Sequence, residues 1–291
     1  MRNRILCNVM AVSALMAVSL SSCVKKDIFQ TPHPDKGAVV LTADWSEAPS
    51  ETDVPQAWSF CINGGQVYQS AHPSQCYPEL LLPGKYTLLA YNEPQGMTLN
   101  GTTAVVNTAS DGLLVAQPEY LYSATRELEV VKDDTLRVTV PMKRLLSPVS
   151  MKVTLDGGNA DNVADIEASL SGVSGSVELA TGKIGESPQT VRLDVEPAET
   201  LSRAGAGKVL ELKCRIVGVC LGYSQMLTVT IKNKDGNVSS VTSDVTEELE
   251  KVNTDKEPVD LEGSVSVSQD GRFSGTIDNW EVVSVGDVEA K

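Results

Sequence analysis

Cys23 is the residue whose type and position most clearly predict a chemical reaction in this chain of 291 residues. Its thiol directly follows Leu20, Ser21 and Ser22, so small side chains precede a nucleophilic sulfur. A thiolate can be alkylated by a diacylglycerol donor, and small residues before it can enter the active site of a peptidase. This order of residues predicts that the chain is cut after Ser22 and that Cys23 carries lipid.

The residues before Cys23 have the composition of an export signal. Arg2 and Arg4 precede an apolar run, residues 9–20, that is interrupted only by two serines. The run is too short for a transmembrane helix, which needs about 20 apolar residues, and it has the length of a signal-peptide core. Residues 20–23 resemble the lipobox of bacterial lipoproteins. The alternative is an ordinary signal peptide followed by an unrelated cysteine.

The predicted mature chain is a lipoprotein of the outer membrane. Residues 1–22 form the signal peptide, and residues 23–37 are polar and contain prolines, as expected of a tether between lipid and fold. Two acyl chains suffice for stable anchoring, so a fully acylated Cys23 would hold the protein on the membrane. Val24 stands where an aspartate is associated with inner-membrane retention, which favours the outer membrane and the cell surface.

The charge of the chain argues against some partners. Its formal charge is −14, and removal of residues 1–22 takes away two arginines and no acids, which makes the mature chain −16. A surface with this much negative charge argues against binding to nucleic acid. It also argues against binding of anionic lipid by a cluster of basic residues. No second apolar segment approaches the length of a transmembrane helix. We therefore expect the acyl group on Cys23 to be the membrane anchor.

Histidines and cysteines offer little support for catalysis. The two histidines are His33, in the predicted tether, and His72, in a predicted loop, and neither lies in a motif such as HExxH, CxxC or GxSxG. His72 and Cys76 could form a metal pair or a nucleophilic dyad, but a solvated loop histidine is the favoured interpretation. We expect a protein that is not an enzyme, with no catalytic residue, cofactor or metal.

Tryptophan side chains could bind sugar rings by stacking on them. Trp45 and Trp58 lie on apolar faces of predicted strands, so we expect them in the core. Trp280 shares its predicted strand face with Thr276 and Asp278, which makes it the candidate platform for a glycan. Burial is the favoured interpretation for Trp280 as well.

Four cysteines follow Cys23 in the mature chain. Cys214 and Cys220 are six residues apart, which is about 20 Å on a straight strand and too far for a disulfide. They are expected to be buried free thiols, unless the chain reverses between them. Cys61 and Cys76 flank a predicted hairpin, and both a disulfide and two free thiols remain open for them.

The elements that position these residues are predicted to be strands. Apolar and polar residues alternate in short segments, with turn signals about every eight to fifteen residues, as is typical of β-sandwiches. We expect an all-β fold of two tandem sandwich domains, residues 38–146 and 147–291, divided within residues 143–148. One short helix is predicted at residues 245–252. The predicted strands are 38–45, 56–63, 65–70, 85–92, 97–106, 120–130, 135–142, 149–155, 166–171, 175–180, 190–195, 209–217, 226–232, 238–241 and 272–285.

The segment from Leu82 to Tyr86 predicts a particular connection. Pro83 and Gly84 predict a tight turn, and residues 85–91 have the composition of a strand. The spacing of Leu82, Gly84 and Tyr86 is typical of a tyrosine corner, in which the tyrosine hydroxyl bonds back to the upstream backbone.

Several segments, taken in order, resemble one known family. They are the lipobox, a first strand ending in Asp44-Trp45, LLLPGKYTLLAYNEPQGM, the SATREL stretch, DTLRVTVPMKRLLSPVSMKVTL and the terminal GRFSGTIDNWEVV. Their order resembles that of Bacteroidetes lipoproteins of the fimbrillin superfamily, especially FimB-like fimbrial anchor subunits. The resemblance implies two transthyretin-like β-sandwiches, a role in surface fimbriae, and association with stalk subunits by addition of a β-strand.

The resemblance also implies a distinction between anchor and stalk. In that family, stalk subunits lose their lipid when an arginine-specific protease removes the first strand. This sequence has no arginine between Arg4 and Arg126, so we expect it to keep its lipid and its first strand. Lys25, Lys26 and Lys36 remain targets for a protease of other specificity. The alternative function is a surface glycan-binding lipoprotein without a pilus role.

Overall fold

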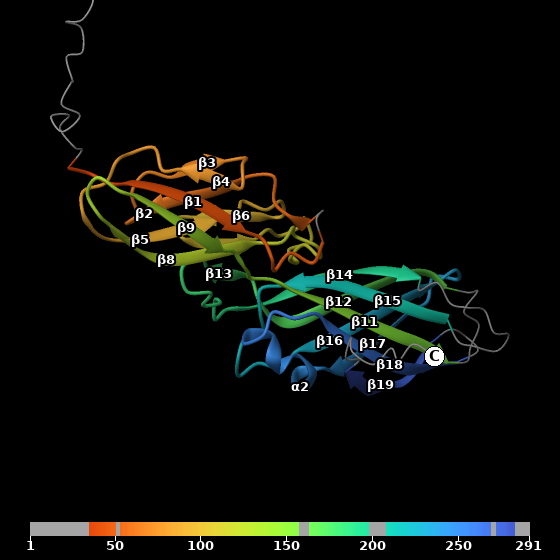
Figure 1. The fold of residues 1–291 in the computed structure, drawn as a ribbon. Coiled ribbons are helices and arrows are strands. Elements are labelled where there is room, and N and C mark those ends of the chain that lie inside the picture. Colours follow the sequence, from red (N-terminus) through yellow and green to blue (C-terminus); the bar gives the residue numbers. More distant parts are fainter. Residues whose placement is uncertain (1–34, 51–52, 157–162, 198–207, 269–271, 283–291) are drawn as a thin grey trace, which may run out of the picture.

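Strands joined by turns and loops make up nearly all of the part of the protein that the structure describes (Figure 1). The computed structural model describes residues 35–50, 53–156, 163–197, 208–268 and 272–282. Within these residues the chain forms strands and a short helical segment, composed of α2 (Thr246–Leu249) and the 3-10 turn η4 (Glu250–Asn253). The predicted all-β class is confirmed.

Two sheets contain most strands of the first half of the chain. The five-stranded sheet has the order β10-β8-β5-β2-β3, and a three-stranded sheet has the order β4-β1-β9. β1 runs parallel to β9, and the other pairs in these two sheets are antiparallel. The bounds are β1 Ala38–Asp44, β2 Trp58–Ile62, β3 Tyr68–Ser70, β4 Ser74–Cys76, β5 Gly84–Tyr91, β8 Tyr122–Val130, β9 Thr135–Pro141 and β10 Lys143–Arg144.

An eight-stranded sheet contains most of the second half. Its order is β17-β16-β12-β14-β15-β11-β18-β19. Its two end strands approach each other, because the Ser243 hydroxyl of β17 donates a hydrogen bond to the Ile277 carbonyl oxygen of β19 at 2.8 Å. The bounds are β11 Ser147–Asp156, β12 Val163–Ser174, β14 Pro188–Pro197, β15 Lys208–Ile216, β16 Met226–Asn233, β17 Val238–Asp244, β18 Val259–Val267 and β19 Phe273–Val282.

A second three-stranded sheet connects the two halves. Its order is β13-β7-β6, in which β13 (Ser176–Glu178) of the second half pairs with β7 (Thr103–Val106), and β7 pairs with β6 (Met97–Asn100). Close by, the Ser123 hydroxyl donates to the Leu179 carbonyl oxygen at 2.6 Å. Buried apolar side chains form one cluster that includes residues of both halves. Backbone pairing and core packing therefore both cross from one half to the other.

Alternation of apolar and polar residues explains the strands. In β1, AVVLTAD, the side chains of Val39, Leu41 and Ala43 are buried and the residues between them are not. β16 follows the same alternation in its first six residues. Such a strand buries one face, which stabilises it by about 1.5–3 kcal/mol for each large apolar side chain. Gly236 has a φ of 87° in the hairpin between β16 and β17, where an Asp235-Gly236 pair forms the turn.

Some predicted boundaries were wrong. Residues 143–148, predicted to interrupt the strands, contain β10 and the beginning of β11. The single strand predicted at residues 97–106 is a hairpin of β6 and β7, with Gly101 at a φ of 64°. β4 and β18 were not predicted, because three residues are too few to show alternation and β18 begins in a polar segment. The helix lies where residues 245–252 predicted it.

Candidate functional site

The first described strand lies inside a sheet. Cys23, the predicted lipidation site, and the rest of residues 1–34 lie outside the described residues, so the lipid anchor stays a prediction. β1 pairs on one edge with β4 and on the other with β9, in a parallel register that runs from Ala38 opposite Thr135 to Asp44 opposite Pro141. Its inward side chains belong to the core, so removal of β1 would open the sheet between β4 and β9.

A groove lies between β8 and β9. The two strands leave a common turn and enter different sheets. β8 pairs with β10 only at Tyr122 and Ser123, and β9 pairs with β1 on one edge. Within the described residues no strand pairs with the facing edges of residues 124–130 and of β9. The groove has a volume of about 460 Å³, and unpaired strand edges at its sides are the structural requirement for accepting an added strand.

Two arginines line this groove, Arg126 from β8 and Arg137 from β9. Arg126 occupies the same face of β8 as the buried Ala124 and Leu128, yet its own side chain is exposed, because the two layers are open at this position. Neither arginine has a carboxylate oxygen within 4 Å in the part of the chain that the structure describes. Leu136 and Val138 of β9 are half-buried and pack against the core. Asp44, Glu127 and Glu129 line the groove as well, so it combines an apolar side with charges of both signs.

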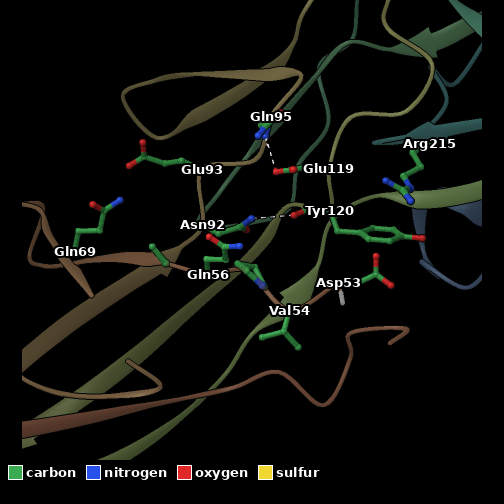
Figure 2. Close-up of a pocket in the computed structure, with 12 residues that line it drawn as sticks. Asp53, Val54, Gln56, Gln69, Asn92, Glu93, Gln95, Glu119, Tyr120 and Arg215 are labelled. Atoms are coloured by element: carbon green, nitrogen blue, oxygen red, sulfur yellow. Dashed lines mark hydrogen bonds between the residues drawn. The ribbon is translucent and has the colours of Figure 1, made fainter. Parts of the chain in front are cut away.

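A second pocket, of about 490 Å³, lies where the two halves meet (Figure 2). It is lined by carboxylate and amide side chains from three loops and by the Tyr120 ring. The Arg215 guanidinium of β15 lies over that ring, 4.1 Å from its centroid, and its Nη1 donates a hydrogen bond to the Pro118 carbonyl oxygen at 3.0 Å. The lining residues labelled in Figure 2 are Asp53, Val54, Gln56, Gln69, Asn92, Glu93, Gln95, Glu119, Tyr120 and Arg215, and Pro55 and Ala57 complete the lining.

Hydrogen bonds hold the loops of this pocket in place. The Asn92 side chain donates to the Tyr120 carbonyl oxygen at 2.9 Å and accepts from the Tyr122 amide at 2.6 Å. The backbone N–H of Gln95 donates to Glu119 Oε2 at 2.9 Å. Burial raises the pKa of the Tyr122 phenol to about 12, so it is neutral at physiological pH. The lining offers donors and acceptors to a polar ligand, and two of its carboxylates, Asp53 and Glu93, accept hydrogen bonds from the Ser50 and Ser59 hydroxyls.

Trp280, the candidate glycan platform, lies half-buried at the edge of the core. Its indole nitrogen donates a hydrogen bond to the Ser243 hydroxyl at 2.9 Å. Two carbons of its six-membered ring lie 3.0 Å from the place that a Cβ on Gly263 would occupy, so the ring packs against the backbone of β18. Part of the ring and the N–H group are thus engaged within the protein.

The other predicted residues are separate from both hollows. His72 lies in an exposed loop, and no group of three or more His, Cys, Asp or Glu side chains within the described ranges is arranged to hold a metal ion. Cys61, Cys76, Cys214 and Cys220 are free thiols. Cys214 and Cys220 are buried, as predicted, and burial raises the pKa of Cys214 to about 12. Trp58 is buried, as predicted, while Trp45 is half-buried with its ring edge against Tyr122.

Sequence reasoning did not find the groove or the pocket. Both are made by residues distant in sequence, and each type of residue is common on exposed strands and loops. One signal was available for the groove, since Arg126 breaks the apolar alternation of Ala124, Leu128 and Val130 at an inward position. An inward charge is a feature of strands at open sheet edges.

The chain matches one family over most of its length. Residues 62–286 match the model of the family described as fimbrillin-A associated anchor proteins Mfa1 and Mfa2. No curated protein matches the chain in sequence. Among the described residues no helix is both long enough and apolar enough to span a membrane.

Solved structures share the fold at low sequence identity. A candidate adhesin from Bacteroides ovatus is 16% identical, with a TM-score of 0.57, and the match covers 89% of this chain and 99% of that one. A candidate adhesin from Bacteroides thetaiotaomicron is 13% identical, with a TM-score of 0.55 and coverage of 87% and 97%. The fimbrial anchor protein Mfa2 from Porphyromonas gingivalis is also 13% identical, with a TM-score of 0.52 and coverage of 85% and 97%. At such identities the likeness concerns the fold.

Proposed function

The chain belongs to the family of fimbrillin-A associated anchor proteins, and we propose that it is the lipid-anchored subunit that holds or initiates a fimbrium at the outer membrane. The family is one of fimbrial proteins rather than enzymes, which agrees with a chain that has few residues suited to catalysis. The lipid is carried by Cys23, and the folded part faces the outside of the cell. The proposal separates an anchor, which stays on the membrane, from a stalk subunit, which leaves it.

The position of β1 between β4 and β9 is the observation that carries this proposal. β1 lies between β4 and β9 with its inward side chains buried, so the fold is complete with the strand in place. The sequence before Arg126 offers no arginine after Arg4 at which an arginine-specific protease could remove the strand. An uncleaved subunit would keep β1 connected to the lipidated Cys23. Such a subunit can occupy the base of a polymer but cannot pass into its stalk.

The groove between β8 and β9 is the proposed acceptor for the next subunit. A partner strand that adds to either open edge would satisfy unpaired backbone groups there without displacing β1. Its apolar side chains would cover Leu136 and Val138, and an acidic side chain would face Arg126 or Arg137. Strand addition supplies affinity through the main chain, whereas the arginines select a partner with matching charge.

We further propose that residues 38–146 and 147–291 are two transthyretin-like sandwich domains in tandem. The separation of β1–β10 from the eight-stranded sheet, which contains β11, β12 and β14–β19, supports the division. The pairing of β13 with β7 and the stacking of Arg215 on Tyr120 join the two. These contacts would hold an anchor rigid while it carries the mechanical load of a fibre.

The amino terminus of the protein in assembled surface fibres tests the proposal. Fibres purified from the native cells are digested, and the first residue of this subunit is identified by mass spectrometry. We expect acylated Cys23, with β1 still attached. A new terminus beyond Asp44 would make the protein a stalk or tip subunit and would reject the anchor function. Copurified subunits identified in the same sample name the partner.

A further inference from the structure

The chain enters its fold between two loops at one end of the molecule. The amide of Gly37 donates to the Leu81 carbonyl oxygen at 2.8 Å, and the Leu81 amide donates back to Gly37 at 2.9 Å. On the other side, the Asp133 amide donates to the Lys36 carbonyl oxygen at 3.1 Å. A Cβ on Gly37 would lie 2.3 Å from the Val131 carbonyl oxygen, so the β8–β9 turn is in close contact with the chain here. This end is the one farthest from the eight-stranded sheet (Figure 1).

Both loops expose large apolar side chains at this end. Leu80 and Leu82 are 50% and 59% exposed, on either side of Leu81, which packs against the core. Val131, in the turn on the other side of the chain, is 55% exposed. These three side chains, called here the apolar tip, are among seven large apolar side chains that are exposed in the described part of the protein. Apolar side chains grouped around one point of a surface mark a contact site more often than scattered ones do.

The position of the tip limits what can cover it. Cys23 precedes Gly37 by fourteen residues. A chain segment of that length reaches at most about 50 Å when fully extended. If the acyl chains of Cys23 lie in a bilayer, the tip is therefore the part of the folded protein held nearest to the lipid. Because the tether keeps the bilayer close to the tip, a weak intrinsic affinity between the two is enough for contact.

The charges around the tip favour apolar over electrostatic contact. Lys36 and Lys132 are exposed there, but so are Asp35, Asp133 and Asp134. The mixture gives no excess of positive charge that would attract anionic lipid. Partial insertion of leucine and valine side chains into the boundary between headgroups and acyl chains requires no such excess.

We propose that the apolar tip, Leu80, Leu82 and Val131, rests on the phospholipid bilayer that holds the acyl chains of Cys23. This inference rests on the proposed lipid anchor. The bilayer then contacts the protein at two points, the acyl group and the tip, and the contact limits how far the folded part tilts. The eight-stranded sheet, at the opposite end, points away from the membrane. A fibre that starts on this subunit would begin in an outward direction.

Fluorescence quenching by lipid tests the contact in the full, acylated protein. Cys76→Ser first removes the exposed thiol, while the buried Cys61, Cys214 and Cys220 do not react with label. Leu82→Cys or Val131→Cys then carries a nitrobenzoxadiazole label, and Val238→Cys is the matched control, because Val238 is 63% exposed on β17. Each protein is reconstituted into phosphatidylcholine vesicles that contain a nitroxide-labelled phosphatidylcholine, and flotation confirms that it is attached.

We expect the nitroxide lipid to quench the labels at positions 82 and 131 at least twofold more than the label at position 238. Quenching should be the same in low and high salt. Equal quenching at the three positions of a floating protein would overturn the tip contact and leave the lipid anchor intact. Loss of the difference in high salt would overturn apolar insertion. An acylated protein that does not float would overturn the lipid anchor and the tip contact together.

Discussion

The phenolic oxygen of Tyr86 lies 2.8 Å from the carbonyl oxygen of Leu82, to which it donates a hydrogen bond. This bond closes the turn that precedes β5 and confirms the tyrosine corner predicted from the spacing of the two residues. It also fixes the backbone of Leu82, whose side chain belongs to the apolar tip. One hydroxyl group thus links the start of a core strand to the end of the molecule where the chain enters its fold.

Tyr86→Phe should lower the free energy of unfolding by about 0.5–1.5 kcal/mol, because it removes one hydrogen bond and leaves the ring in place. Urea denaturation followed by circular dichroism measures the change. Tyr223→Phe is the matched control, since Tyr223 is 53% exposed and should lose no stability. Equal stability of wild type and Tyr86→Phe would mean that the corner contributes nothing to the fold.

Cys23→Ala should abolish incorporation of labelled fatty acid and leave the signal peptide uncleaved after Ser22, because the free thiol accepts the lipid and the lipidated cysteine is then the substrate of cleavage. Metabolic labelling measures the incorporation of fatty acid, and the mass of the product shows whether the signal peptide was cleaved. Cys7→Ala, within the predicted signal peptide, is the control and should be acylated normally. The folded part should be unchanged in either variant. Equal labelling of the Cys23→Ala variant and wild type would reject the lipoprotein prediction.

Arg126→Glu should weaken binding to the partner subunit on the order of tenfold, since it places a negative charge in the groove between β8 and β9. Surface plasmon resonance with the copurified subunit measures the affinity. Lys152→Glu is the control, because Lys152 lies on β11 and pairs with Glu262 at 3.2 Å, away from the groove. Equal losses in both variants would show a general effect of charge, and no loss in either would exclude Arg126 from the interface.

Lys256 predicts a dependence of stability on pH. Its ammonium group donates to the Val217 and Val252 carbonyl oxygens at 2.7 and 2.9 Å, and burial lowers its pKa to about 8. The unfolded chain keeps the ordinary value of about 10.4. Between these values the unfolded state binds a proton that the folded state has released, so the contribution of Lys256 to the free energy of unfolding should rise with pH.

Urea denaturation of the wild type and of Lys256→Met at pH 7 to 10 isolates this contribution, because the difference in stability between the two proteins should rise with pH. The buried thiols of Cys61, Cys214 and Cys220, whose pKa values are raised, lower the stability of both proteins equally as the pH rises. A difference that stays constant from pH 7 to 10 would mean that Lys256 remains protonated between its two carbonyl acceptors.

Local patterns predicted most of the strands and the tyrosine corner because both depend on neighbouring residues. Alternation in β1 and β16 is visible within seven or eight residues. Burial of Cys214 followed from its place in an apolar strand. Such features can be predicted without knowing which distant segments pack against them.

Pairing between distant segments was not predictable in the same way. β13 and β7 are short strands from different halves of the chain. The sequence of neither strand indicates which other strand it pairs with. The same holds for Arg215 and Tyr120, whose stacking depends on β15 lying beside the loop that precedes β8. In the sequence, Trp280 shares its strand face with the polar residues Thr276 and Asp278. Its ring nevertheless packs on β18, because Gly263 has no side chain to occupy that space.

The sequence by itself determined the all-β class, the short helix, the corner at Tyr86 and the prediction of a lipid on Cys23. Only the tertiary structure decided that β1 lies between β4 and β9, that β8 and β9 leave a groove, and that Leu80, Leu82 and Val131 lie exposed at the same end. The physical reason is that alternation and turn residues act over a few neighbours, whereas an open edge or an exposed patch depends on which distant segments leave it uncovered.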